Sequence, residues 1–159
     1  MAKMLVCYYS RSGHTRKMAE EVAAGAGKVS GVSVDLKSVE QIKADDLMGY
    51  DAIMIGSPTY YGSMAAAIKQ LFDDSVAFHG QLDGKVGGAF SSSANVGGGN
   101  ETTILDILNA MLIHGMVVQG SPKGDHYGAV AVGGVDQRSG GECLKHGQLV
   151  ATLARKLHG

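Results

Sequence analysis

The segment over residues 10–15 combines residue types suited to binding a phosphate group. It reads Ser-Arg-Ser-Gly-His-Thr and lies between an apolar run over residues 3–9 and a helical pattern that begins at Thr15. A helix N-terminus offers unpaired N–H groups and a partial positive charge. With three hydroxyls beside them, these groups predict a phosphate monoester site; the competing interpretation is an ordinary helix cap by Ser12.

Two further segments place polar and glycine residues directly after apolar runs. The first, over residues 57–62, reads Ser-Pro-Thr-Tyr-Tyr-Gly, and its adjacent tyrosines could form a flat, partly polar wall for a ring system. The second, over residues 91–102, brings three serines, Asn95 and a run of three glycines. Such a loop can wrap a planar ligand with backbone donors, although a glycine run is also typical of a flexible loop.

Other nucleotide-binding motifs are absent from these segments. No Gly-Lys-Ser or Gly-Lys-Thr occurs, which excludes a Walker A loop, and no Gly-x-Gly-x-x-Gly follows the first apolar run. The first run also lacks an aspartate at its end, which argues against a receiver domain that accepts a phosphoryl group. The pattern therefore argues against a Rossmann-type dinucleotide site.

Alternating strand and helix patterns position these segments. Short apolar runs predict strands, and apolar spacing on one face predicts helices. Strands joined by crossover helices run parallel, which predicts an α/β fold with a doubly wound, five-stranded parallel sheet in the order 2-1-3-4-5. The loops after strands 1, 3 and 4 would then converge at the carboxyl edge of the sheet. We predict strands over 3–9, 32–36, 50–55, 86–90 and, in two pieces, 116–118 and 129–132, and helices over 15–29, 65–72, 102–114 and 142–157.

Composition narrows the function classes. The 159 residues suit one domain over 1–159, and the formal net charge of −1 argues against nucleic-acid binding. No apolar run is long enough to span a membrane, and no signal-peptide pattern follows Met1, so we expect a cytoplasmic protein. Cys7 and Cys143 form no Cys-x-x-Cys motif, and Cys7 lies in an apolar run typical of a buried thiol. We expect no metal site.

Taken together, these segments resemble the flavodoxin superfamily, and most closely its WrbA-type NAD(P)H:quinone oxidoreductases. The similarity runs almost from end to end of the chain. It is carried by AKMLVCYYSRSGHT, YDAIMIGSPTYYGSM, FSSSANVGGGNETT, HGMVV and YGAVAVGG. The resemblance implies a flavodoxin-like fold and one bound FMN.

The resemblance also implies a role for individual residues. The segment 10–15 would hold the FMN phosphate, and the segments 58–62 and 92–98 would line the two sides of the isoalloxazine ring. His114 would approach the ring edge or the substrate as a catalytic residue; the alternative is a histidine favoured by the dipole at a helix C-terminus. The predicted FMN contacts are Ser10, Arg11, Ser12, Gly13, His14, Thr15, Pro58, Thr59, Tyr60, Tyr61, Gly62, Ser92, Ser93, Ala94, Asn95, Val96, Gly97 and Gly98.

The activity that the resemblance implies is two-electron transfer from NAD(P)H to a quinone-like acceptor by a homo-oligomer. The sequence departs from the family pattern at Tyr60, where an arginine is usual, and it contains no tryptophan. The alternative is a flavodoxin-type electron carrier that serves a redox protein partner. Such carriers are typically strongly acidic, which steers them to basic partners, whereas this chain is nearly neutral.

Overall fold

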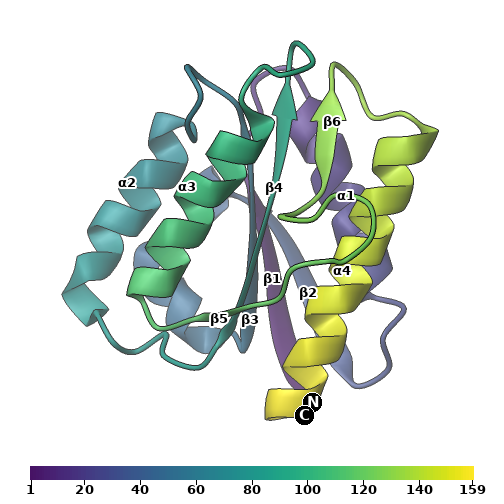
Figure 1. The fold of residues 1–159 in the computed structure, drawn as a ribbon. Helices are drawn as coiled ribbons and strands as arrows, with labels where there is room; N and C mark the ends of the chain where they lie inside the picture. The colour runs from purple at the N-terminus through teal and green to yellow at the C-terminus, as the bar shows by residue number, and fades with distance from the viewer.

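The computed structural model describes residues 1–159 and has a parallel sheet at its centre (Figure 1). The strand order is β2-β1-β3-β4-β5, with β6 also paired to β4, which confirms the predicted order. The short strands β5 and β6 share the fifth position, because β5 pairs with the start of β4 and β6 with its end. The strands are β1 (Ala2–Tyr8), β2 (Val32–Ser38), β3 (Ala52–Pro58), β4 (Val86–Ser93), β5 (Val117–Val118) and β6 (Val130–Val132).

Helices cover both faces of the sheet. In Figure 1, α1 and α4 lie on one face and α2 and α3 on the other. Each face has its own cluster of buried apolar side chains, so the central strands are buried on both sides. Every residue of β4 is buried. The helices are α1 (His14–Ala26), α2 (Ala66–Asp74), α3 (Asn100–Ile113) and α4 (Gln137–His158), with short 3-10 helices η1 (Val39–Gln41), η2 (Ala44–Gly49) and η3 (Ser75–Phe78).

Two glycines allow α1 and α4 to pack unusually close together. A Cβ atom on Gly147 of α4 would lie 2.0 Å from the carbonyl oxygen of Val22, and one on Gly25 of α1 would lie 2.1 Å from that of Leu144. No side chain can occupy either position without moving the helices apart. The close contact is therefore set by residue size at two positions.

Several element boundaries differ from those predicted. The last helix begins at Gln137 rather than Glu142, because the Asp136 carboxylate accepts a hydrogen bond of 2.7 Å from the backbone N–H of Ser139 and caps the helix. The third strand begins at Ala52, and the hydroxyl of Tyr50, two residues before it, donates a hydrogen bond of 2.8 Å to Asp35 of β2. Cys7 is buried as predicted, and burial raises its pKa to about 12. None of the helices combines the length and apolar character that a membrane-spanning helix needs.

Candidate cofactor site

The three predicted loops meet at the carboxyl edge of the sheet, where they enclose a cavity of about 400 Å³. This is the upper edge in Figure 1, where the chain leaves β1, β3 and β4. The parallel strand order explains the convergence, since the carboxyl ends of neighbouring strands lie side by side. The cavity is lined by Arg11, Ser12, His14, Thr15, Pro58, Thr59, Tyr60, Ser92, Ser93, Ala94 and Gly133.

The first loop presents backbone donors instead of a side-chain cap. Gly13 occupies the N-cap position of α1 with φ +96°, a left-handed conformation that favours glycine, and no side chain caps the helix. The interpretation of Ser12 as an ordinary cap is therefore wrong. Within the chain, no acceptor binds the backbone N–H groups of Ser12, His14, Thr15 and Arg16. Ser10 is already engaged, because its Oγ accepts 3.1 Å from Gly13 N–H.

Free N–H groups at the positive end of a helix form an anion-binding cradle. Arg11 adds a cation at the rim of the same cavity and forms no ion pair with any carboxylate of the chain. No Asp or Glu lines the cavity. The site therefore suits a phosphate monoester, as the sequence predicted.

A hydroxyl network holds the loops in place. Thr15 Oγ1 and Ser92 Oγ lie 3.0 Å apart and join the first loop to the third. Thr59 Oγ1 lies 3.1 Å from Ser91 Oγ and accepts from Thr103 Oγ1 at 3.0 Å, which joins the second loop to β4 and α3. Most of these side chains are buried, so their hydrogen bonds fix the loop geometry before any ligand enters.

The second loop forms an aromatic wall beside the cavity. Tyr60 and Tyr61 are both exposed, and with Arg11 they line an open cavity of about 580 Å³. Tyr61 has φ +53°, rare for a residue with a side chain, and Gly62 follows with φ +77°. The Gly62 carbonyl accepts 2.7 Å from Thr102 Oγ1 of α3, which anchors the turn.

Only the first residues of the third loop line the cavity. Ser93 and Ala94 line the cavity, whereas Val96 at the loop tip is 90% exposed. The structure leaves Asn95, Val96, Gly97 and Gly98 outside the cavity lining, so their contact with a ring remains a prediction.

His114 lies at the opposite edge of the sheet from the cavity, so nothing within one chain brings it to the site, and its approach to the ring edge or the substrate stays a prediction. It follows α3, which begins beside the cavity at Asn100 and runs about 20 Å away from it. The next strand starts at Val117, which pairs with Val86, the first residue of β4.

His114 has a structural environment of its own. Ser75 Oγ donates 2.6 Å to the Phe72 carbonyl, so it must accept the 2.7 Å hydrogen bond from His114 Nε2–H. The buried Nδ1 atom then remains without a partner. The His114 ring is stacked with Phe78, and burial, with the nearby His79, lowers the pKa of His114.

Gly133 lines the cavity although it was not among the residues predicted from the sequence. It follows β6, and its N–H donates 2.8 Å to the Ser93 carbonyl, which brings the chain after β6 to the end of β4. The available signal was the Gly133-Gly134 pair directly after the second half of the last strand. A glycine pair in that position matches the glycine-rich loops after the other strands.

Comparison with known proteins places the chain in a family. The family model of the flavodoxin domain matches residues 5–97. A flavodoxin of Aquifex aeolicus is 41% identical over 140 residues, which cover 84% of this chain and 76% of that protein. An NAD(P)H dehydrogenase (quinone) of Rhodopseudomonas palustris is 37% identical over the full length of both chains. The chain therefore belongs to the flavodoxin family.

Solved structures agree with this assignment. A WrbA-like flavodoxin protein from Agrobacterium tumefaciens superposes with a TM-score of 0.83 at 26% identity and covers 99% of both chains. A flavodoxin from the domain Archaea has a TM-score of 0.79 at 29% identity and covers 96% of this chain and 99% of that one.

Membership of this family makes FMN the cofactor, and the residues present fit it. The free N–H groups at the start of α1 suit the phosphate, because they have no other partner and no carboxylate faces them. The exposed tyrosines next to that cradle suit a flat ring. The sequence predicted both features.

Proposed function

We propose that this protein is an FMN-dependent oxidoreductase that transfers two electrons from NAD(P)H to a quinone-like acceptor. The observation that carries the proposal is the full-length similarity to proteins named NAD(P)H dehydrogenase (quinone). Three of them are 35–37% identical and are covered over 100% of both chains. In the overall reaction, NAD(P)H, a proton and the quinone give NAD(P)⁺ and the hydroquinone.

The chain would contribute binding and positioning to this reaction. When bound, FMN supplies a hydride acceptor that can pass both electrons on to another molecule. The N–H groups at the start of α1 would hold its phosphate, and the hydroxyl network through Thr59 and Ser92 would keep the loops in position. Tyr60 and Tyr61 would present a flat surface beside the ring. No carboxylate or histidine lines this open face, so the proton for the quinone would come from solvent.

A second candidate function is that of an electron carrier. It is favoured by the 41% identity to a protein named flavodoxin and by the close fit of a solved archaeal flavodoxin. A carrier would exchange electrons with a redox protein and would have no turnover with NAD(P)H. The near-neutral charge of the chain gives it little electrostatic attraction for a basic partner.

Steady-state assays separate the two functions. The FMN-loaded protein should oxidise NADH or NADPH continuously when benzoquinone is added, at a rate proportional to protein concentration. The control is the same protein depleted of FMN, which should have no activity. Failure to oxidise either nucleotide, with electron exchange to an added ferredoxin or flavodoxin reductase, would establish the carrier function instead.

We also propose that residues 1–159 form one FMN-binding unit that assembles as a homo-oligomer. Support comes from apolar side chains at the amino edge of the α2–α3 side: Val76 and Ile113 are each 73% exposed and Leu112 is 57% exposed. Burial of such side chains in an interface would remove apolar surface from water.

A further inference from the structure

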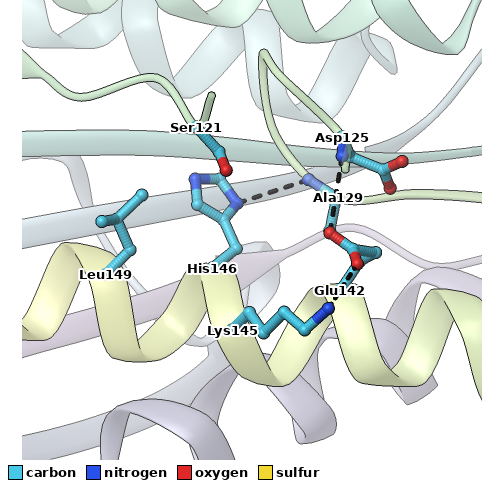
Figure 2. Close-up of a pocket in the computed structure, with 7 residues that line it drawn as sticks. All are labelled: Ser121, Asp125, Ala129, Glu142, Lys145, His146 and Leu149. Carbon is cyan, nitrogen blue, oxygen red and sulfur yellow. Dashed lines mark hydrogen bonds and ion pairs between the residues drawn. The ribbon is translucent and has the colours of Figure 1, made fainter. Parts of the chain in front are cut away.

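The charged side chains of one cavity, about 170 Å³ between α4 and the segment before β6, are paired within the chain (Figure 2). Glu142 pairs with Lys145 at 2.8 Å, and Asp125 pairs with Arg138 at 3.0 Å. His146 is buried in the same cavity, and burial lowers its pKa to about 4, so the ring is uncharged near pH 7. This cavity therefore offers no unpaired charge to a ligand.

Arg11, by contrast, is a cation without a partner at the cofactor edge. It is exposed and forms no ion pair, whereas the next two cations along the chain are paired on α1: Arg16 with Glu20 and Lys17 with Glu21, each at 3.1 Å. Arg11 lines both the cofactor cavity and the open cavity of about 580 Å³ beside it. No Asp, Glu or Lys and no other Arg lines either cavity, so a negative charge beside Arg11 must come from a bound molecule.

The FMN phosphate has donors that do not include Arg11. The N–H groups of Ser12, His14 and Thr15 have no acceptor within the chain and lie at the positive end of α1. These three residues line the cofactor cavity but not the open one, and Arg11 is the residue of this loop that lines both. Arg11 is therefore available to a second anion at the open face.

The open cavity also presents aromatic surface held in a strained turn. Tyr60 and Ser63 exchange two backbone hydrogen bonds, of 2.9 and 3.2 Å, which close a turn with Tyr61 and Gly62 at its tip. Tyr61 has a positive φ that disfavours a side chain, yet its ring is fully exposed. The Tyr60 ring packs edge-on against Tyr9, with ring centroids 6.4 Å apart. A strained and exposed aromatic residue beside a cofactor site indicates a surface for a flat molecule.

We propose that the electron acceptor is a flat quinone with a negatively charged substituent, and that Arg11 selects it; this inference rests on the quinone reductase function proposed above. The quinone ring lies against Tyr60 and Tyr61, and its carboxylate or sulfonate pairs with the planar guanidinium fork. The quinone gains two electrons and a hydrogen from NAD(P)H and a proton from solvent, and the charged substituent is unchanged. A positively charged acceptor would meet Arg11 as a like charge.

Equilibrium binding tests this selection without turnover. Naphthalene-2-sulfonate and naphthalene-2-sulfonamide share a flat ring, but only the sulfonate is charged near neutral pH. The oxidised, FMN-loaded protein, whose phosphate cradle is filled, is titrated with each probe and followed by the visible absorption of FMN. The sulfonate should bind about three- to fivefold more tightly at low salt, and the difference should vanish at about 1 M salt. Equal affinities at low salt, or no binding of either probe, would overturn the proposal.

Variants assign the preference to one side chain. Arg11→Gln should make the two affinities equal, and Arg11→Lys, which keeps the charge but loses the fork, should retain part of the preference. The control is Lys17→Ala, because Lys17 is a nearby cation that pairs with Glu21 and lines neither cavity. This variant should prefer the sulfonate as the unmodified protein does. An undiminished preference in Arg11→Gln would refute the role of Arg11.

Steady-state kinetics identify which reactant Arg11 selects. The kcat/KM for 1,2-naphthoquinone-4-sulfonate, divided by that for 1,2-naphthoquinone, should fall about three- to fivefold in Arg11→Gln. This ratio cancels any change in FMN occupancy. A loss confined to kcat/KM for NADPH would assign Arg11 to the electron donor and overturn the proposal. If no quinone is turned over, the proposed function fails, whereas equal binding of the two naphthalene probes refutes the selection by Arg11 and leaves that function standing.

Discussion

The helices on the two sides of the sheet differ in how tightly they pack and in how much apolar surface they leave exposed. On one side, glycines bring α1 and α4 so close that backbone carbonyls lie where a Cβ would be. On the other side, the end of α3 and the adjoining η3 leave Ile113 and Val76 largely exposed, and the buried Nδ1 of His114 has no partner. The first side is complete within one chain, whereas the exposed apolar side chains of the second side are those that we propose another copy covers. The cofactor site lies where the two sides meet, because α1 and α3 both begin there.

The largest expected effect is a loss of stability on the side where α1 and α4 pack closely. Gly147→Ala should lower the free energy of unfolding by about 2–3 kcal/mol or more, because its Cβ would overlap the Val22 carbonyl oxygen. The measurement is denaturant unfolding followed by circular dichroism. The matched control is Gly141→Ala in the same helix, where a Cβ meets nothing within 4 Å. That change should raise stability by about 0.5–1 kcal/mol, the usual gain in a helix interior. Equal effects would show that α1 and α4 are not closely packed.

The free energy of unfolding should also depend on pH through His146, which lies on the same side of the sheet. The His146 pKa is about 4 in the folded chain and about 6.5 unfolded, so the unfolded chain binds more protons between these values. Stability should therefore fall as the pH drops from about 6.5 to about 4, by up to about 3 kcal/mol. Unfolding free energies measured across this range, for the protein and for His146→Leu, check the result. A slope that is unchanged in the variant would assign the acid sensitivity to other groups.

At the cofactor site, where the two sides meet, the backbone N–H groups at the start of α1 should contribute more to FMN affinity than the side chain of Arg11. Gly13→Val should weaken FMN binding about tenfold or more, because a β-branched residue strongly disfavours φ +96°. Arg11→Ala should weaken it about two- to threefold, since an exposed charge is screened by salt. Quenching of FMN fluorescence measures both constants. The reverse order would show that Arg11, not the backbone, holds the phosphate.

On the incompletely covered side, a surface charge should change assembly more than stability. Ile113→Lys should alter the free energy of unfolding by less than about 0.5 kcal/mol per chain but shift the protein towards a monomer of 16.4 kDa. Light scattering over a range of concentrations gives the mass. The control is Leu157→Lys, an exposed apolar position near the end of α4. A monomer at all concentrations before any substitution would refute the proposed oligomer.

FMN affinity of the His114→Ala variant, measured over a range of protein concentrations, tests whether His114 acts on the site of another copy. FMN affinity should be unchanged in the monomer, because His114 lies at the far edge of the sheet. A loss of affinity seen only at concentrations where the protein assembles would mean that His114 reaches the FMN of another copy.

Much of the fold and the centre of the cofactor site could be predicted from the sequence. Alternating strand and helix patterns imply parallel strands, and parallel strands place the loops 10–15, 57–62 and 91–102 at one edge. The free N–H groups follow from a helix that begins directly after Gly13, since the first turn of any helix has no internal acceptors. The strand and helix patterns and the unpaired N–H groups are local properties, so neighbouring residues determine them.

Tertiary structure decided the features that join distant parts of the chain. His114 was placed at the ring because of a family resemblance, whereas a helix between parallel strands must run back to the opposite edge. Gly133 enters the cofactor cavity because its N–H bonds to Ser93, forty residues earlier. The hydrogen bond from Ala129 to His146 joins a loop to a helix, and because Nδ1 accepts this bond, the proton of the neutral ring lies on Nε2. Contacts of this kind depend on packing between elements, which no local pattern of residues encodes.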